Sequence, residues 1–374
     1  MEPGVYLRRI SRLAEFAEER GLCRVAVVDE SSVFYLTGYR GAGALVVSPD
    51  GSATLYVPVL EYLNALDQLR ESGLYGDVDV KAYTPYGLPR ELVVSESVEV
   101  VEKPLEKIIG EGCEACGLAG GGRRLWEGLS GACNRVEDVS EYVYQMRMRK
   151  EPWEIERMRV AAEIAEAALQ AAMEELREGV SEAEVAGRIY YEMRRRGADD
   201  YSFPPIVAFG LNTVYPHAIP SHRRRLRGPT PVLIDLGAKY MGYSSDMTRT
   251  FYFAGSPPEF RHIAEGVLDA LYEAIDAVHS GVRASEVDAK ARGVLAKYGL
   301  DKYFIHSLGH GIGIDVHEPP RVTFNSDTTL EDGMVVTIEP GVYIPGRMGV
   351  RIEEMVLVTK RKAITLTKFP AKLW

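Results

Sequence analysis

The amino-acid sequence predicts an α+β fold in two parts, in which an α/β domain precedes a larger α+β domain with an internal repeat. Three observations support this fold class. Apolar strand-like segments alternate with helix-like segments in the first third of the chain, which is typical of a layered sheet. A segment beginning at Gly179 resembles another beginning at Gly281. Two pairs of carboxylates each flank glycine-containing turns between strand-like runs.

Residues 1–135 are predicted to form the α/β domain. Apolar side chains at helical spacing predict a helix over residues 6–20, and a second helix is expected over residues 60–72. Short apolar runs predict strands at residues 23–28, 43–47, 53–57 and 78–83. The glycines at residues 120–122 predict a flexible turn rather than a phosphate-binding loop, because no Gly-Lys-Ser/Thr sequence follows them.

A linker over residues 136–152 is expected to lead into the α+β domain, residues 153–374. Pro152 is tolerated there because a proline in the first turn of a helix removes no hydrogen bond. A long helix is expected to run from Pro152 to about residue 178, since apolar residues recur on one face of this segment.

The α+β domain contains a weak repeat with an offset of 102 residues, in which Glu184 and Tyr201 match Glu286 and Tyr303. Each copy is preceded by a helix, continues as a helix, and then leads to strands that carry one carboxylate pair. The repeat predicts two α+β halves related by pseudo-twofold symmetry. A site between the halves would receive one carboxylate pair from each.

The first carboxylate pair is Asp235, which closes an apolar run, and Asp246, which opens another. A hairpin centred near Tyr240 and Met241 would place the two aspartates opposite each other. Opposed residues in an antiparallel pair have β-carbons about 5 Å apart. Two negative charges at that distance repel each other unless a cation lies between them.

The second pair is Glu339 and Glu353, each at the end of a strand-like run. A loop centred on Gly346 would place these glutamates opposite each other, and His310 lies upstream. Two inward carboxylate pairs with one imidazole form a ligand set rich in hard oxygen, which suits two divalent cations bridged by shared carboxylates. This set favours Mn or Co, with Fe or Zn as alternatives.

Three segments resemble the pita-bread metallopeptidases of family M24, which include Xaa-Pro dipeptidases (prolidases), Xaa-Pro aminopeptidases and methionine aminopeptidases. They are residues 234–250 with IDLG and SDMTRT, 309–321 with GHGIG and VHEPPR, and 337–353 with TIEPG and VRIE. The resemblance spans roughly residues 145–374 and implies a pita-bread fold there. The N-terminal domain resembles the creatinase/prolidase type, which methionine aminopeptidases lack.

The resemblance implies a role for each member of the ligand set. Asp246 and Glu353 would bridge both metal ions. Asp235 would bind one ion, and His310 and Glu339 would complete the other. Glu339 would also accept a proton from the attacking water.

The resemblance further assigns residues to the substrate. His217 and His317 are expected to contact the substrate and to help move protons. Arg321 matches an arginine of the prolidase-like branch and would bind the substrate. A purely structural alternative is that Arg321 pairs with Glu318 or Glu331.

The function implied by the resemblance is hydrolysis of Xaa-Pro peptide bonds by a hydroxide that two metal ions activate. Small peptides with proline at the second position are the expected substrates. We prefer a dipeptidase over an Xaa-Pro aminopeptidase acting on longer peptides. A non-catalytic binding protein of the same fold is an alternative of a different class. Loss of a metal ligand would signal such a protein, and all five predicted ligands are present.

Composition limits the partners. The net charge of −10 argues against nucleic acid, which binds clustered Lys and Arg. No apolar run approaches the ~18 residues that span a membrane, and the N-terminus lacks a signal-peptide layout. We therefore expect a cytoplasmic homodimer that binds neither nucleic acid nor membranes. Only four Asn and three Gln are present, which indicates a thermophilic source.

The chain has four cysteines, and Cys113 and Cys116 have the spacing of half a zinc site or of a redox pair. No second such pair follows, and no histidine lies nearby in the sequence. We interpret this spacing as coincidence or as a local structural disulfide. The sequence leaves open whether these two cysteines pair.

Overall fold

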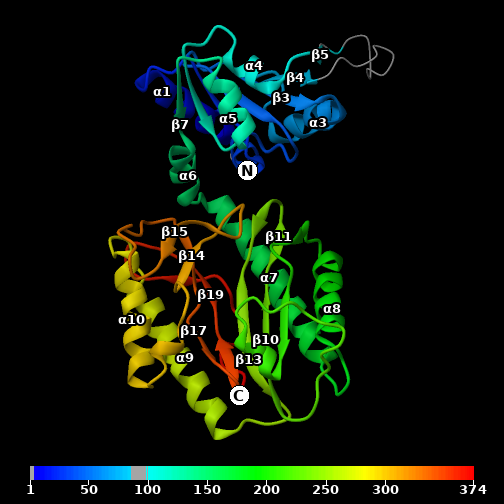
Figure 1. The fold of residues 1–374 in the computed structure, drawn as a ribbon, viewed down its shortest axis with the longest axis vertical. Coiled ribbons are helices and arrows are strands. Elements are labelled where there is room, and N and C mark those ends of the chain that lie inside the picture. The colour runs from blue at the N-terminus through cyan, green and yellow to red at the C-terminus, as the bar shows by residue number, and fades with distance from the viewer. Residues whose placement is uncertain (1–3, 86–97, 99) are drawn as a thin grey trace. The chain divides into compact units, whose positions relative to one another are not determined.

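The computed structural model describes residues 4–85, 98 and 100–374 (Figure 1). The chain divides into two compact units, Met1–Arg147 and Met148–Trp374. The division falls within the segment 136–152 that the sequence predicts as a linker. In the described part of the chain, no helix is both long and apolar enough to cross a membrane.

The first unit contains a seven-stranded mixed sheet with the strand order β5-β4-β3-β2-β1-β6-β7. Strand β2 is antiparallel to both β1 and β3, and the other neighbours are parallel. The strands are β1 (Arg24–Val27), β2 (Ala44–Val47), β3 (Ala53–Pro58), β4 (Asp79–Tyr83), β5 (Val100–Val101), β6 (Ala115–Ala119) and β7 (Arg135–Asp138). The four predicted strands correspond to β1 to β4 and are confirmed.

The helices of the first unit are α1 (Val5–Glu19), α2 (Glu30–Thr37), α3 (Tyr62–Ser72), α4 (Leu105–Gly110), α5 (Arg123–Ser130) and α6 (Ser140–Met148), with a 3-10 turn η1 (Val59–Glu61) before α3. Helix α1 buries Ile10 and Leu13, whose helical spacing predicted it. Asp29 caps α2 by accepting a hydrogen bond from the Ser32 amide at 2.8 Å. The two predicted helices of this unit are therefore confirmed as α1 and α3.

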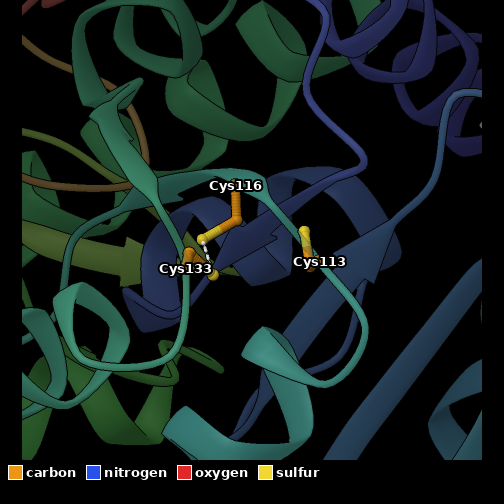
Figure 2. Close-up of side chains that lie close together, drawn as sticks. All are labelled: Cys113, Cys116 and Cys133. Carbon is orange, nitrogen blue, oxygen red and sulfur yellow. Dashed lines mark hydrogen bonds between the residues drawn. The ribbon is translucent and has the colours of Figure 1, made fainter.

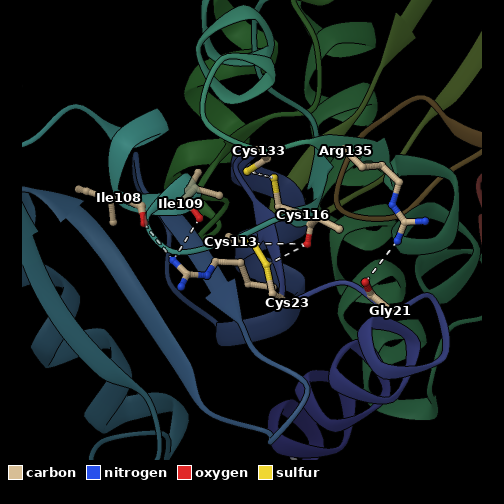
Figure 3. Close-up of a disulfide and its surroundings, with 10 residues drawn as sticks. Gly21, Cys23, Ile108, Ile109, Cys113, Cys116, Cys133 and Arg135 are labelled. Atoms are coloured by element: carbon tan, nitrogen blue, oxygen red, sulfur yellow. Dashed lines mark hydrogen bonds between the residues drawn. A yellow bond between two sulfur atoms is a disulfide. The ribbon is translucent and has the colours of Figure 1, made fainter.

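A disulfide joins Cys23, just before β1, to Cys113, just before β6 (Figure 3). These positions meet because β1 and β6 are parallel neighbours, and the Cys23 amide donates to the Ala115 carbonyl at 2.8 Å. Cys113 therefore pairs with Cys23 and not with Cys116. The interpretation of residues 113 and 116 as a local disulfide is wrong, because the partner comes from a strand far away in the sequence.

The second unit consists of two similar halves, and Figure 1 shows α8 on one side of its strands and α9 and α10 on the other. Helices α8 (Glu182–Arg195) and α10 (Ala284–Lys297) have equal lengths and begin 102 residues apart, which confirms the offset of the predicted repeat. Helices α7 (Pro152–Glu175) and α9 (Pro258–Ala277) both have proline in the first turn.

The first half forms two three-stranded sheets, β13-β10-β9 and β12-β11-β8, and the second half forms a five-stranded sheet, β15-β14-β16-β19-β20, with a two-stranded sheet, β17-β18. The strands of the first half are β8 (Asp200–Tyr201), β9 (Ile206–Phe209), β10 (Thr230–Leu236), β11 (Ala238–Tyr240), β12 (Tyr243–Ser244) and β13 (Met247–Phe253). Those of the second half are β14 (Gly309–Gly311), β15 (Glu318–Val322), β16 (Val335–Ile338), β17 (Gly341–Ile344), β18 (Met348–Arg351), β19 (Glu354–Leu357) and β20 (Ile364–Thr365). Short 3-10 turns lie at η3 (Gly210–Val214) and η4 (Asp301–Tyr303).

Each half packs its helices against its strands through an apolar cluster of its own. In the first half Leu169 and Ile189 pack with Ile234 of β10, and all three are fully buried. In the second half Leu271 and Val336 belong to the corresponding cluster. Full burial of such a side chain stabilises the fold by about 1.5–3 kcal/mol. The strand ends that carry the predicted ligands are therefore held by well-packed layers.

Candidate metal centre

The first carboxylate pair lies on the hairpin of β10 and β13. Asp235 in β10 pairs with Thr248, and Asp246 directly precedes β13. The prediction that the two aspartates oppose each other is therefore wrong by two residues. Because side chains two residues apart on a strand share a face, Asp246 is instead a diagonal neighbour of Asp235, still on the same face of the sheet.

The turn of this hairpin explains the difference in register. Tyr240 pairs with Tyr243, so the turn consists of Met241 and Gly242, both of which have positive φ angles of 46° and 87°. Such two-residue turns match the twist of the strands, and glycine adopts the required φ without a steric penalty. The centre lies one residue later than predicted, and that displacement moves the pairing by two residues.

The second pair lies where two strand ladders of the second half meet. The β16–β19 and β17–β18 ladders share one register, in which Glu339 and Glu353 are opposite each other, as predicted. The turn between β17 and β18 contains Gly346 at φ 73°. The predicted single hairpin is two separate ladders, since Pro340 has no amide hydrogen to continue the pairing beyond Glu339.

His310, the middle residue of β14, lies among these carboxylates. Its Nε2 atom lies 3.7 Å from Asp246 Oδ2 and 3.5 Å from Glu339 Oε1. Ligand atoms of Asp246, His310 and Glu353 all lie within 4.8 Å of one another. Nδ1 lies 3.0 Å from the Gly311 carbonyl, so a proton on Nδ1 leaves Nε2 free as a metal ligand.

The glycines on either side of His310 allow its strand to approach its neighbours closely. A β-carbon at Gly309 would lie 1.9 Å from the Thr337 carbonyl oxygen, and one at Gly311 would lie 2.2 Å from the Pro319 carbonyl oxygen. No side chain fits at either position. The glycines of the motif are therefore required for the packing that brings the His310 imidazole to the carboxylates.

Two carboxylate oxygens of the cluster are buried without a hydrogen-bond partner among the described residues. They are Asp235 Oδ1 and Glu353 Oε1. The second oxygen of each group is satisfied, because Arg351 donates to Asp235 Oδ2 at 2.5 Å and Thr248 donates to Glu353 Oε2 at 2.7 Å. An unsatisfied buried polar group costs about 1–3 kcal/mol, and more when it is charged. Divalent cations would satisfy both oxygens, so the residues present fit a metal centre.

Burial sets the protonation of this cluster. Burial, with repulsion from the neighbouring carboxylates, raises the pKa of Asp246 and of Glu353 well above the ordinary range. Burial raises the pKa of Glu339 to about 8. Burial, with the nearby His317, lowers the pKa of His310 to about 4, which keeps the imidazole in its neutral, metal-binding form. Cations would therefore replace protons on these carboxylates.

Arg351 contacts the predicted ligand Asp235, and the sequence analysis did not identify it as part of the site. Its guanidinium is buried, with 3 % of the side chain exposed, and it donates to Asp235 and to the Tyr343 hydroxyl, both at 2.5 Å. It also donates to the Pro216 carbonyl at 3.2 Å. Because strand residues two apart share a face, its place two residues before Glu353 was an available signal.

Tyr343 and His306 extend this network and were also missed. His306 Nε2 lies 3.1 Å from the Tyr343 hydroxyl, and Nδ1 lies 2.8 Å from the Ser307 carbonyl. Burial, with the charge of Arg351, lowers the pKa of His306 to about 4. Burial raises the pKa of Tyr343 to about 12. No spacing rule in the sequence marks these two residues, since their contacts are made by tertiary packing.

The two histidines predicted to contact substrate are exposed, in contrast to the metal ligands. The ring of His317 lies 4.4 Å from the ring of His310 in an edge-to-face arrangement. Partial desolvation of the ring by the surrounding protein, with the charge of His217, lowers the pKa of His317. The structure therefore brings His317 next to the cluster. His217 follows Pro216, whose carbonyl Arg351 holds, and its charge acts on His317.

Arg321 is exposed, and its backbone pairs with His310 across β14 and β15. Both structural alternatives for Arg321 are wrong, because Glu318 pairs with Lys150 at 3.1 Å and Glu331 pairs with Arg149 at 3.7 Å. Among the described residues no carboxylate forms an ion pair with Arg321. The arginine instead lines a cavity of about 520 Å³ together with Ser307, Thr323, Phe324, Asn325 and Ser326.

Comparisons with known proteins agree with this geometry. Residues 156–360 match metallopeptidase family M24, and residues 9–149 match the creatinase/prolidase N-terminal domain. The chain is 37 % identical over 369 residues to the Xaa-Pro dipeptidase of Pyrococcus horikoshii, and the match covers 98 % of each chain.

Solved structures give the same result. The crystal structure of the prolidase from Pyrococcus horikoshii OT3 is similar with a TM-score of 0.87 at 34 % identity, and the match covers 98 % of this chain and 100 % of that one. The X-Pro aminopeptidase from Thermotoga maritima MSB8 gives a TM-score of 0.80 at 28 % identity, over 96 % of this chain and 99 % of that one. The chain therefore belongs to metallopeptidase family M24, and it is a peptidase that uses divalent metal ions.

Proposed function

We propose that the protein is an Xaa-Pro dipeptidase (prolidase), which hydrolyses dipeptides with a C-terminal proline. The observation that carries the proposal is the pair of buried carboxylate oxygens without partners, Asp235 Oδ1 and Glu353 Oε1. They lie in a chain that is 37 % identical over 98 % of its length to an Xaa-Pro dipeptidase. A non-catalytic protein of this fold is expected to have lost a metal ligand, and all five are present.

We propose that Asp235, Asp246, His310, Glu339 and Glu353 hold two divalent cations, with Asp246 and Glu353 shared between them. Oxygen-rich ligand sets with a single imidazole favour Mn or Co. When bound, the two cations would lower the pKa of a water molecule toward neutrality and polarise the scissile carbonyl.

Glu339 is the proposed proton acceptor. Its carboxylate would lie beside the metal-bound water, within reach of the water proton, and Thr337 donates to its Oε1 atom at 3.5 Å. Its side chain is 16 % exposed, against 10 % for Asp235 and 7 % for Asp246. A proton on Glu339 can therefore exchange with substrate or solvent.

His317 and His217 are proposed to serve the substrate side. Partial desolvation, with the charge of His217, lowers the pKa of His317, so its imidazole is neutral near pH 7 and can donate a hydrogen bond to the oxygen that becomes negative during attack. The leaving nitrogen of an Xaa-Pro bond carries no hydrogen before cleavage. It must gain a proton, and an exposed imidazole is suited to deliver it.

Arg321 is proposed to bind the proline carboxylate. It lacks a carboxylate partner among the described residues, it lines a cavity, and its backbone pairs with that of His310. This assignment separates the two candidate activities, since a dipeptide has its carboxylate directly after the cleaved bond and a longer peptide does not. An Xaa-Pro aminopeptidase is the second candidate, supported by the similarity to the Thermotoga maritima structure.

A panel of peptides tests the proposal. The protein loaded with Mn or Co is incubated with Ala-Pro, Met-Pro, Ala-Pro-Ala and Met-Ala-Ser. A dipeptidase cleaves the first two and little of the others. Rapid cleavage of Ala-Pro-Ala would assign the aminopeptidase activity, and cleavage of Met-Ala-Ser alone would reject proline specificity.

The role of Arg321 is tested on the same substrates. Arg321→Ala should raise KM for Ala-Pro by roughly ten- to a hundredfold, because a charge-assisted hydrogen bond contributes about 1.5–3 kcal/mol. The control is Ala-Pro-amide, which offers no carboxylate and should lose far less. Equal losses on both substrates would reject the carboxylate contact. A homodimer, a cytoplasmic location and a thermophilic source stay predictions from the sequence.

A further inference from the structure

Two thiols lie in contact in the core of the first unit. Cys116 is on β6 and Cys133 follows α5, and their Sγ atoms are 2.9 Å apart (Figure 2). Both residues are buried, with exposed fractions of 0 % and 7 %, and neither is part of the disulfide already described. The peptidase centre lies in the other unit, so this pair has no part in the proposed hydrolysis.

The spacing of the pair favours a covalent bond over a shared metal ion. Two thiolates on one tetrahedral zinc ion, each about 2.3 Å from the metal, lie roughly 3.8 Å apart. The observed 2.9 Å is shorter than that separation. The neighbours, which include Ala26, Ile109 and Leu129, are apolar. A neutral disulfide suits such a core, whereas metal-bound thiolates would place charge in it.

A third sulfur connects this pair to the protein surface. The Sγ atoms of Cys113, Cys116 and Cys133 all lie within 4.8 Å of one another. Cys113 is bonded to Cys23, and Figure 3 shows that disulfide beside the inner pair. Cys23 is the exposed member of the four, whereas the other three are buried. A reagent in solution can therefore reach the outer disulfide but not the inner thiols.

We propose that Cys116 and Cys133 form a second disulfide, and that the exposed Cys23–Cys113 disulfide oxidises them by thiol–disulfide exchange. The fully oxidised first unit then holds all four cysteines of the chain in two bonds. The inner bond ties β6 to the segment between α5 and β7, and the outer bond ties β6 to β1.

The exchange balances without any group beyond the four cysteines and a small disulfide. The Cys116 thiolate attacks Cys113 Sγ, which breaks the Cys23–Cys113 bond and releases the Cys23 thiolate. The Cys133 thiolate then attacks Cys116 Sγ and releases Cys113. Two electrons have moved from the inner pair to the outer pair. A small disulfide such as oxidised glutathione reoxidises the outer pair at the exposed Cys23, and two glutathione thiols leave.

Burial predicts that the inner step is slow. Burial, with Cys133, raises the pKa of Cys116 to about 12, so few molecules hold the attacking thiolate at any moment. The short separation of the reacting sulfurs offsets this, because Cys116 and Cys113 lie within 4.8 Å and need to move little to meet. Oxidation over minutes to hours is the expected range for such exchange.

Thiol counting tests the proposal on the whole chain. Protein incubated with oxidised glutathione is denatured in guanidinium with a chelator and titrated with a thiol reagent. We expect no free thiols, against all four cysteines after reduction. Two free thiols would show that only the outer bond exists and would overturn the proposal. Four free thiols would show that the chain holds no disulfide and would overturn the proposal as well. The chelator ensures that any thiolates held by a metal ion are counted as free.

A double variant tests the pairing and the route. In Cys23→Ser/Cys113→Ser only the inner thiols remain. This variant is digested, without reductant, by a protease that cleaves on the C-terminal side of arginine and lysine. Peptide 108–123 should then be recovered linked to peptide 125–135. The variant should oxidise on the order of tenfold more slowly than the wild type, since the exchange partner is absent. Unlinked peptides after exhaustive oxidation would overturn the bond. An unchanged rate would overturn the route through the outer disulfide. Cys116→Ser/Cys133→Ser is the matched control and should keep only the outer bond.

Discussion

The two halves of the second unit build a carboxylate pair in different ways, and each half stabilises a ligand of the other. Asp235 and Asp246 are diagonal neighbours on one hairpin, whereas Glu339 and Glu353 are directly opposite where two ladders meet. Thr248 of the first half donates to Glu353 of the second half at 2.7 Å. The repeat supplies a similar set of helices and strands twice. The two carboxylate pairs differ because the strands that carry them pair in different registers.

A buried guanidinium makes the contact in the opposite direction. Arg351 of the second half donates to Asp235 of the first at 2.5 Å, and its side chain is almost fully buried. The exchange of contacts means that neither half completes the site by itself. Variants that remove single ligands or contacts of this site are expected to differ in the size of their effect, and the largest effect comes first below.

The largest effect is expected from removing a shared ligand. Asp246→Ala should abolish activity and release both cations, because this carboxylate is proposed to bridge them. Metal analysis and turnover on Ala-Pro measure the outcome. Asp276→Ala, an exposed aspartate on α9, is the control and should behave as the wild type. Two cations still bound to the Asp246 variant would contradict the bridging role.

Breaking the contact from the second half to the first should have the next largest effect. Arg351→Met removes the hydrogen bonds to Asp235 and to the Pro216 carbonyl, which positions the segment before His217. Turnover should fall by about 10²-fold, the scale that small misplacement of reacting groups produces. Arg347→Met, on the exposed turn of the same hairpin, is the matched control. Wild-type turnover in the Arg351 variant would show that the guanidinium is not needed for positioning.

A loss of turnover without loss of metal is expected at the substrate side of the site. His317→Ala should lower turnover by about 10²-fold or more, the usual scale of general acid–base effects, and should keep both cations because His317 is not a proposed ligand. His222→Ala, an exposed histidine in the first half, is the control. Loss of metal from the His317 variant would move this residue into the ligand set.

The smallest effect concerns stability of the metal-free protein. Burial raises the pKa of Glu339 to about 8 from an ordinary value of 4.5, so the folded chain binds its proton more tightly than the unfolded chain does. The contribution of this proton to the free energy of unfolding is fully present below about pH 4.5 and is lost as the pH rises through 8. Between pH 4.5 and 6.5 the lowered pKa values of His306 and His310 oppose this effect, so the test uses the range above the ordinary histidine pKa. Thermal unfolding of chelated protein should show Tm falling between pH 6.5 and pH 8, and added Mn should remove the fall. A metal-free Tm that rises between pH 6.5 and pH 8 would contradict the burial of these carboxylates.

Much of this arrangement could be predicted from the sequence because it depends on local spacing. The offset of 102 residues appears in the structure as the equal helices α8 and α10. The opposition of Glu339 and Glu353 followed from a turn at Gly346. These features depend on turn chemistry and periodicity, which one segment of sequence contains.

The rest depends on contacts that local patterns do not contain. The turn at Met241 and Gly242 lies one residue from the predicted centre, because positive φ at both positions decides where the chain reverses. Tyr343 and His306 meet only when a hairpin and a loop pack together. Cys23 and Cys113 become partners through the pairing of β1 with β6. Tertiary packing determined each of these.

The central claim is that the two halves jointly hold two cations through shared carboxylates. Anomalous X-ray scattering from crystals of the Mn-loaded protein tests it most directly. The account predicts two anomalous peaks, both contacted by Asp246 from the first half and Glu353 from the second. A single peak, or two peaks each bound by one half alone, would contradict it.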